Sequence, residues 1–417
     1  MTESRLARRL GMFDAVVIGL GSMIGAGVFA AFAPAAGAAG NGLLIGLAIA
    51  AIVAYCNATS SAQLAALYPE SGGTYVYGRK RLGDFWGFLA GWGFVVGKLA
   101  SCAAMAMTFA TYVAPSLARP LAVGAIVALT AVNYVGVRKT ALVTRAIVAV
   151  VLATLATGIA AIWIGGSADV AQVWSLAGTS AYGVLQSAGF LFFAFAGYAR
   201  IATLGEEVIE PTRTIPRAIP IALGITLVVY VAVATSVLAG AGASVVASST
   251  VPLTAAVEAG QLASLSWVVR IGAAVASLGA LLSLIAGVSR TAFAMAANRD
   301  LPSYLAAVHP SYRVPHRAEA VAGAIAAVVA AIADVRSAIG FSSFAVLTYY
   351  MIANASAWTL GREERRGPRV LSLVGTLGCA ALAITLPIPS IIGGASVLAV
   401  GAIVFAARRL GGRRLSS

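Results

Sequence analysis

The sequence has 417 residues, of which 60% are hydrophobic and only 10% charged, and its mean hydropathy is +0.94. A soluble globular domain carries about 25% charged residues, so the composition excludes a soluble fold and predicts an all-α polytopic membrane protein. The formal net charge is +14. Its basic residues fall in short clusters between apolar runs, as topology signals do, which argues against a nucleic-acid partner.

The first apolar run begins after a basic N-terminal segment, residues 1–12, that we expect in the cytoplasm. It is too long for a secretory signal peptide and lacks a small-residue cleavage site. The three cysteines, Cys56, Cys102 and Cys379, lie inside apolar segments and are expected to be small buried hydrophobes, not disulfide partners.

A membrane-spanning helix needs about 20 apolar residues, and the chain has twelve segments of this kind. Two short joins, after the ninth and the eleventh segments, leave room for a miscount. The predicted spans are 13–36, 41–67, 85–114, 119–137, 141–165, 180–204, 215–240, 267–297, 318–335, 338–360, 369–388 and 390–408.

The charges predict the orientation of these spans. With the N-terminus in the cytoplasm, 24 of the 28 Lys and Arg residues fall inside, leaving only Arg119, Arg270 and Arg336 outside and Lys98 within a span. Such a bias predicts both termini on the cytoplasmic side of the inner (cell) membrane. A short surface helix is expected around Leu253–Leu262, in the outside stretch after the seventh span.

The first span contains three glycines within seven residues, Gly21, Gly25 and Gly27. Each costs a helix interior roughly 1 kcal/mol relative to alanine. Bare backbone is tolerated in a bilayer only where it faces protein or a water-filled cavity. The stretch therefore predicts a helix break that holds a small zwitterion. By itself it also fits an unbroken helix in which Gly21 and Gly25 form a small-residue packing face.

The sixth span carries a related irregularity, because aromatic residues crowd one side of Gly197 and Arg200 follows. Gly197 lies 172 residues after Gly25, at the corresponding place of a second five-helix unit. Paired glycine-interrupted helices in two halves are the best sequence pointer to a transporter site, so the pair favours two breaks. Simple packing in the bundle or against lipid accounts for some of the aromatics.

Several motifs, spread over nearly the whole chain, resemble those of the amino acid–polyamine–organocation (APC) superfamily of permeases. They are specific in combination and in this order. The motifs are Gly25–Phe29, Pro69–Tyr75 with Gly91-Trp92, Phe193–Tyr198 with Glu206, Glu207 and Pro211, Ile215–Ile219, Ser289–Ala296, Asp300-Leu301-Pro302 and His309-Pro310.

The resemblance implies a five-plus-five inverted repeat like that of the leucine transporter, with the first and sixth helices discontinuous. The repeats would be residues 13–165 and 180–360, followed by two peripheral helices in 369–408 and a cytoplasmic tail, 409–417.

The resemblance also implies an amino acid substrate, whose carboxylate meets peptide N–H groups and whose ammonium group meets peptide carbonyls. The gate would be Phe195 or Tyr198. By position, the N–H donors are Gly25, Ala26 and Gly27, and the carbonyls are those of Met23, Ile24, Phe195, Ala196 and Gly197.

The chain departs from the family pattern in its charges. Many relatives carry a lysine in the fifth helix, where this sequence has Val151, whereas Lys98 stands about 12 residues, or ~18 Å, into the third helix, near the centre of a ~30 Å core. An intramembrane charge is a functional hypothesis by default. We expect Lys98 to contact the substrate or to titrate during transport; the alternative is a lysine bonded to backbone carbonyls without a transport role.

No acidic residue is expected deep in a span, and Ala199 occupies a place where many relatives have a carboxylate. Burying the second charge of a cationic substrate without a partner is costly, which favours a neutral amino acid. The acidic residues at or near span ends are Asp14, Glu206, Glu207, Glu258, Glu319 and Asp334. Further pocket residues are left open among Ser101, Cys102, Ser283, Ser342 and Ser343.

Two other classes of function compete with a secondary transporter. An enzyme would need a catalytic motif, and neither a metal or cofactor fingerprint nor a nucleophile elbow is present; the Glu206-Glu207 pair and the histidines His309 and His316 lie in cytoplasmic connectors. A channel would conduct without saturation. Import, export and exchange, the coupling ion (protons included), the particular amino acid and the oligomeric state stay open.

Overall fold

The computed structural model describes residues 10–70, 72–136, 141–176, 178–202 and 207–414. This part of the chain is helical and has no strand, apart from one isolated bridge between Leu10 and Val208. Ten of its helical stretches are long and apolar enough to cross a membrane. The predicted class, an all-α multi-pass membrane protein, is confirmed. Residues 1–9, Glu206 and the last three residues of the predicted tail lie outside the described residues.

The helices follow one another with short connections. In chain order they are α1 (Met12–Met23), α2 (Ala26–Ala30), α3 (Phe32–Ala39), α4 (Leu43–Leu67), α5 (Thr74–Leu82), α6 (Asp84–Val113), α7 (Ala118–Tyr134), α8 (Ala141–Ile164), α9 (Val170–Val173), α10 (Ala181–Phe195), α11 (Ala199–Ala202), α12 (Pro211–Ser248), α13 (Pro252–Glu258), α14 (Ser266–Ala297), α15 (His316–Ile332), α16 (Val335–Trp358), α17 (Arg369–Thr385) and α18 (Ile388–Arg414).

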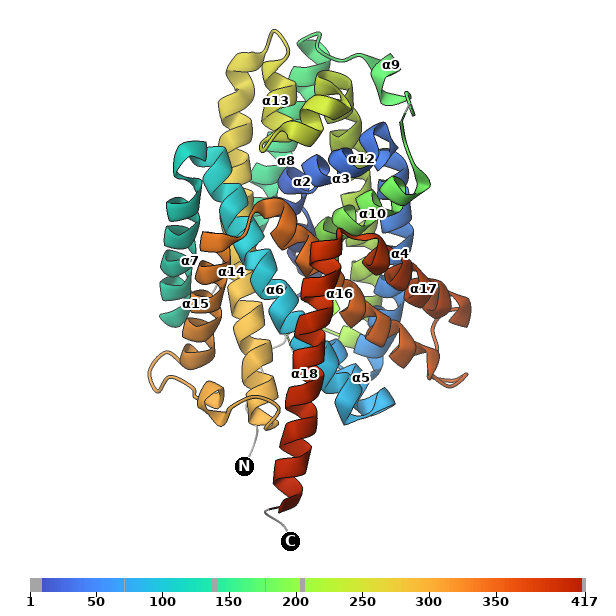
Figure 1. The fold of residues 1–417 in the computed structure, drawn as a ribbon, viewed down its shortest axis with the longest axis vertical. Coiled ribbons are helices and arrows are strands. Elements are labelled where there is room, and N and C mark those ends of the chain that lie inside the picture. Colours follow the sequence, from blue (N-terminus) through green and yellow to red (C-terminus); the bar gives the residue numbers. More distant parts are fainter. Residues whose placement is uncertain (1–9, 71, 137–140, 177, 203–206, 415–417) are drawn as a thin grey trace.

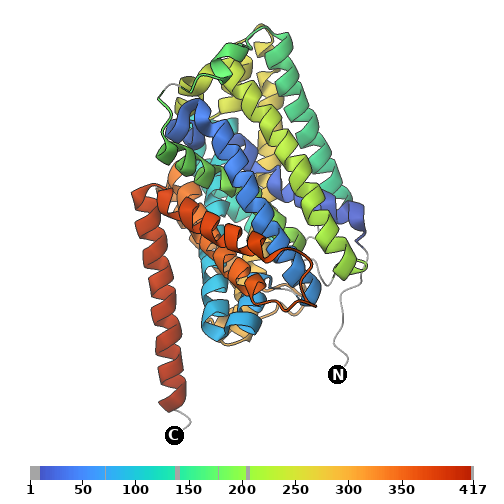
Figure 2. The ribbon, with the colours of Figure 1, turned by 90° about the vertical axis from the view of Figure 1, so that its right-hand side faces the viewer.

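The long helices surround α6, which crosses the middle of the molecule and packs against α14 and α16 (Figure 1). α10 packs against α3, α4 and α16. α18 runs along one edge of the molecule (Figure 2), where it packs against α6 and α16. The C-terminal part of α18 projects below the other helices in both views.

Most predicted spans coincide with helices to within a few residues. The ninth and eleventh predicted spans correspond to α15 and α17. Each of these helices has 17 residues, which is shorter than the about 20 residues that a membrane-spanning helix needs. The expected surface helix is α13.

The seventh predicted span, 215–240, is too short at both ends, because α12 runs from Pro211 to Ser248 with a kink at Gly242. Pro211 suits a first helical turn, where its missing N–H is no loss. Pro216 cannot donate to the carbonyl of Thr212, and the Arg366 side chain donates to that oxygen instead, at 2.5 Å. Part of the segment between the sixth and seventh predicted spans is therefore helical.

α5 was not predicted as a helix. It begins after Gly73 (φ 57°) and ends at Gly83 (φ 101°), both in the left-handed region that favours glycine. Its side chains anchor a set of ion pairs that we call the basal ion cluster. The cluster consists of Tyr75, Arg79, Asp84, Asp300 and Arg409.

The basal ion cluster joins α5 to three other parts of the chain. Arg79 pairs with Asp84 of α6 at 3.2 Å and with Asp300, after α14, at 2.6 Å. The Tyr75 hydroxyl donates to Asp300 at 2.7 Å, and Arg409 of α18 pairs with Asp84 at 2.7 Å. Burial, with the Asp300 carboxylate beside it, raises the pKa of Tyr75.

Candidate functional site

The first predicted break is present. α1 ends at Met23, Ile24 and Gly25 leave the helical conformation (ψ 41° and −136°), and α2 begins at Ala26. A Cβ atom on Gly25 would lie 2.8 Å from Cβ of Ala280 in α14. Gly25 therefore also allows close packing of two helices. The alternative of an unbroken first helix, which the sequence alone did not exclude, is wrong.

The second irregularity has a different form. α10 ends at Phe195, and residues Ala196–Tyr198 make a 3-10 turn before the short helix α11. The chain tightens at Gly197 and is not extended there. Such a turn still leaves the last carbonyls of α10 without their ordinary helical partners.

The two breaks contact each other through glycine backbone. A Cβ on Gly197 would lie 2.2 Å from the carbonyl oxygen of Ser22 and 2.8 Å from the amide nitrogen of Met23. A Cβ on Gly27 would lie 2.7 Å from Cα of Ala194. Real Cβ contacts are essentially never under 3.0 Å, so only glycine allows this approach.

Three buried tyrosines from three other helices hold the carbonyls beside the breaks. The hydroxyl of Tyr230 in α12 lies within hydrogen-bond distance of both Met23 O, at 2.6 Å, and Ala194 O, at 3.0 Å, so its single proton is shared between the two breaks. Tyr350 of α16 donates to Ala196 O at 3.2 Å, and Tyr112 of α6 to Phe29 O at 3.1 Å.

Sequence reasoning missed Tyr112, Tyr230 and Tyr350. The available signal was a tyrosine in the middle of an apolar span, since a buried hydroxyl needs a partner.

The aromatic side chains of the second break lie in ring contacts. The Phe195 ring lies 5.0 Å from the Tyr230 ring, centroid to centroid, and Tyr198 stacks on Tyr350 at 5.1 Å. Both residues are fully buried. Each candidate gate is therefore held by a tyrosine that also binds a break carbonyl.

The structure brings the predicted peptide groups of the two breaks together. Within the described chain, no hydrogen-bond acceptor is found for the N–H groups of Gly25, Ala26 and Gly27. Two of the predicted carbonyls, Met23 and Ala196, already accept a tyrosine hydroxyl. The buried members of the set are Met23, Ile24, Gly25, Ala26, Gly27, Phe195, Ala196 and Tyr198; Gly197 is half-buried.

Lys98 is buried in α6, with 9% of its surface exposed. Among the described residues its ammonium group has no hydrogen bond or ion pair, and none joins it to either break. Ser101, one turn further, bonds to Ser342 of α16 at 2.6 Å. The alternative for Lys98 was a hydrogen bond to backbone carbonyls. The described part of the chain contains no such bond.

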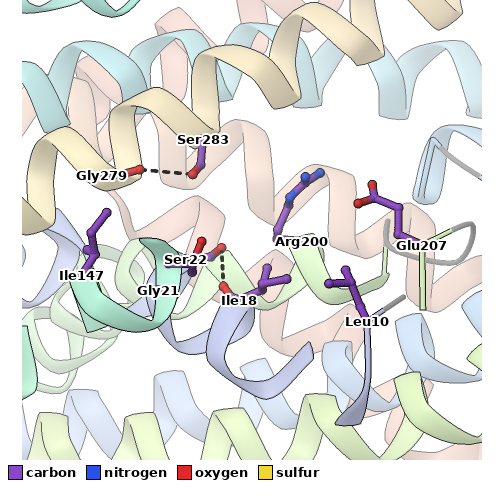
Figure 3. Close-up of a pocket in the computed structure, with 10 residues that line it drawn as sticks. Leu10, Ile18, Gly21, Ser22, Ile147, Arg200, Glu207, Gly279 and Ser283 are labelled. Atoms are coloured by element: carbon purple, nitrogen blue, oxygen red, sulfur yellow. Dashed lines mark hydrogen bonds between the residues drawn. The ribbon is translucent and has the colours of Figure 1, made fainter. Parts of the chain in front are cut away.

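A cavity of about 130 Å³, which we call the vestibule, reaches the last turn of α1, next to the first break, at Gly21 and Ser22 (Figure 3). Arg200 and Glu207 both line it, and their side chains lie near each other. Ser283 of α14 lines it too, with its hydroxyl turned to the carbonyl of Gly279. The other lining residues are Leu10, Ile18, Thr144, Ile147 and Gly279.

Glu319 lies near the start of α15, as predicted, but is only 2% exposed. Its burial was not expected from a position at a span end. Among the residues described, no group of three or more His, Cys, Asp or Glu side chains could hold a metal ion.

Comparison with known proteins agrees with this geometry. Residues 10–407 match the family described as "Amino acid permease". An uncharacterized transporter of Mycobacterium tuberculosis is 62% identical over 412 residues, covering 98% of this chain and 93% of the relative. The branched-chain amino acid permease BcaP of Bacillus subtilis is 23% identical over 92% of this chain and 87% of the relative. Cationic amino acid transporter 4 of Homo sapiens is 26% identical over 88% of this chain and 62% of the relative. The chain belongs to the amino acid permease family, within the APC superfamily.

Proposed function

We propose that this transporter carries a neutral amino acid across the cell membrane by alternating access, with the substrate held between the two breaks. The observation that carries the proposal is the direct contact of the breaks through Gly197 and Ser22, bridged by Tyr230. Peptide groups gathered at one buried point suit a dipolar ligand, because a zwitterion needs donors and acceptors but adds no net charge.

The polarity of the peptide groups fits the two ends of an amino acid. The N–H groups of Gly25, Ala26 and Gly27 would donate to the carboxylate. The carbonyls of Ile24, Phe195 and Gly197 are free of tyrosine hydroxyls among the described contacts and would accept from the ammonium group. Binding would separate the breaks slightly, since they now touch.

The vestibule gives the proposal a direction. It reaches the last turn of α1, next to the first break, at Ser22, whereas Phe29 and Tyr112, beyond the break, are fully buried and in ring contact at 5.7 Å. This conformation is thus open toward one end and closed toward the other. The positive-inside bias would make the open end cytoplasmic, with twelve spans and both termini inside.

The inverted repeat, 13–165 against 180–360, is part of the same proposal. It is supported by the paired positions of the two breaks, Gly25 and Gly197.

A neutral substrate is favoured by the charges around the site. Among the described residues, Glu207 is the acidic residue that lines the vestibule, and it lies beside the Arg200 side chain. The relatives are named for branched-chain and for cationic amino acids. Among the described residues, a second positive charge on the substrate would find no carboxylate at the breaks, which favours a neutral substrate such as a branched-chain amino acid.

Lys98 is proposed to supply the positive charge that the fifth helix lacks at Val151. Its burial without an ion pair in the described chain is the support. Such a cation is stabilised when an anionic group arrives, so it would act by contacting the substrate or by titrating.

The test is uptake and counterflow in proteoliposomes with a panel of neutral, cationic and acidic amino acids, with and without a pH gradient. We expect saturable counterflow of one or more neutral amino acids. Flux that does not saturate would indicate a channel, and failure of every amino acid to exchange would overturn the proposal. Counterflow without any response to the pH gradient would favour an exchanger or exporter.

A further inference from the structure

Glu319 is a buried carboxyl group that lies against Ser289 of α14 and Asn133 of α7. It is 2% exposed, and Ser289 of α14, which faces it, is 0% exposed. The carboxyl oxygen Oε2 and the Ser289 hydroxyl are hydrogen-bonded. The other oxygen, Oε1, is buried and has no partner among the described residues.

The Ser289 hydroxyl has a second contact that bears on where the protons are. It donates to the carbonyl of Ala286 at 3.1 Å. A hydroxyl has one proton and a carbonyl only accepts. Both contacts of Ser289 are satisfied together when Glu319 itself carries a proton and donates to the serine oxygen.

The burial points the same way, because an ionised carboxylate with one oxygen unpaired is far more costly to bury than a neutral acid. No ion pair to Glu319 is found in the described chain, although basic residues are near it. Four elements pack against α15, namely α6, α7, α14 and the turn Ser303–Ala306.

The groups that these elements and α15 itself direct toward Glu319 are few. Cys102 of α6 lies within electrostatic reach, with Lys98 one turn away. Asn133 of α7 faces the carboxyl and also donates to Leu282 O at 3.0 Å.

The remaining basic groups make no ion pair with Glu319 in the described chain. Arg290, next to Ser289, is exposed to solvent and lies within electrostatic reach of the carboxyl group. On α15 itself, Arg317 lies over the Tyr304 ring at 4.5 Å and His316 packs edge-on to Tyr134 at 5.8 Å.

We propose that Glu319 is the proton-binding site of this transporter: protonated in the present conformation, it loses its proton to water when α14 and α15 separate. This inference rests on the proposed function. The step is a simple dissociation, in which the carboxylic acid O–H bond breaks, the electron pair stays on the carboxylate and the proton passes to water.

α14 connects this site to the breaks. One face of α14 meets the first break, where Ala280 approaches Gly25, and lines the vestibule at Ser283. The same helix presents Ser289 to Glu319. A movement of α14 that opens or closes the site would therefore also make or break the bond that holds the proton.

Charge balance gives a direct consequence. A zwitterion moved with one proton carries a net charge of plus one, so uptake would respond to the membrane potential as well as to pH. A pH gradient of one unit could then drive about tenfold accumulation.

The first experiment does not depend on transport. Infrared difference spectra of the protein in membranes, recorded across pH, would show the C=O band of a protonated carboxylic acid. We expect Glu319→Gln to lose this band and Glu258→Gln, an exposed partner of Arg270, to keep it. If wild type and Glu319→Gln give the same spectra, the inference is wrong.

A second variant keeps this test valid if Glu319→Gln does not fold. Ser289→Ala leaves the carboxyl in place and removes its partner, so the band should persist and shift in frequency. An unchanged band would contradict the hydrogen-bond assignment.

The second experiment separates exchange from coupling in proteoliposomes. Glu319→Gln should keep counterflow, which needs no net proton movement, and lose accumulation driven by a one-unit pH gradient, from about tenfold to about onefold. Tenfold accumulation by the variant would overturn the inference. Absence of counterflow in wild type would instead overturn the proposed function, with the infrared result still standing.

Discussion

The breaks in the middle of the protein and the basal ion cluster at its end are held together by opposite means. At the breaks, tyrosine hydroxyls donate to carbonyls and glycine backbones touch. At the basal ion cluster, Arg79 and Arg409 pair with Asp84 and Asp300.

The difference follows from the surroundings. A charge buried in a membrane protein costs several kcal/mol unless it is paired with good geometry, whereas a neutral hydrogen bond adds only about 0.5–1.5 kcal/mol and can be broken and remade. Contacts that must open in every transport cycle are therefore better made of neutral hydrogen bonds than of buried ion pairs. Variants that convert one kind of contact into the other, or remove it, test this contrast.

The largest effect is expected from Gly197→Ala. Its Cβ would meet backbone atoms of Ser22 and Met23, which cannot rotate away as a side chain does. Overpacking typically costs about 1–3 kcal/mol, and here it would also push the two breaks apart. We expect uptake to fall below detection, and the thermal midpoint of the purified protein to drop.

Gly224→Ala is the matched control, because nothing lies within 4 Å of a Cβ built on Gly224 in α12. It should keep uptake and gain helix stability of up to about 1 kcal/mol. Normal uptake by Gly197→Ala would show that the contact between the breaks is not needed.

Lys98→Met is expected to have the next largest effect. Hydrogen bonds to charged groups contribute about 1.5–3 kcal/mol, so losing a contact to the substrate should lower kcat/KM at least about tenfold. Uptake would be measured over a range of pH, with Lys80→Met as the control, since Lys80 is exposed and pairs with Glu70 on the surface. Wild-type uptake and pH dependence in Lys98→Met would refute its role.

Tyr230→Phe should cost less, because the ring remains and only the hydroxyl is lost. Met23 O and Ala194 O would both lose their donor, and an unsatisfied buried acceptor costs about 1–3 kcal/mol. We expect a decrease in transport rate of about fivefold or more.

Tyr350→Phe removes the donor to Ala196 O, a bond of 3.2 Å that is longer than either contact of Tyr230, and should have a smaller effect in the same uptake assay. An equal or larger loss in Tyr350→Phe would show that bridging the two breaks is not what matters about Tyr230.

The same contrast explains what the sequence could and could not predict. Spans follow from about 20 apolar residues in a row, and the breaks follow from glycines placed against helix propensity. These are local signals. Tyr230 bonds to Met23 across 207 positions in the chain, so its role depends on how α12 packs and has no local signature.

The helix α5 and the burial of Glu319 were not predicted, for a related reason. α5 is short and carries Arg79, Lys80 and Arg81, so nothing apolar marks it, and its contacts to Asp300 come from a distant loop. Glu319 follows a polar loop, and only the packing of α14 over it makes it buried. The distribution of charges along the sequence predicts that such residues lie near span ends. It does not predict which of their side chains a neighbouring helix will bury.

The smallest effect is expected in the basal ion cluster. Asp300 accepts from Arg79 at 2.6 Å and from Tyr75 at 2.7 Å, and its side chain is 12% exposed, whereas that of Arg79 is 31% exposed. Solvent screens such pairs, so Asp300→Asn should change the free energy of unfolding by about 1 kcal/mol or less, and less still at high salt.

Asp84→Asn should cost even less than Asp300→Asn, since Asp84 is 47% exposed. Thermal stability at two salt concentrations, with the substrate KM measured alongside, compares both with Tyr230→Phe. If Asp300→Asn reduced transport as much as Tyr230→Phe does, the ion pairs of the basal ion cluster would also have to open during transport. The neutral contacts at the breaks would then not by themselves account for the opening of the site.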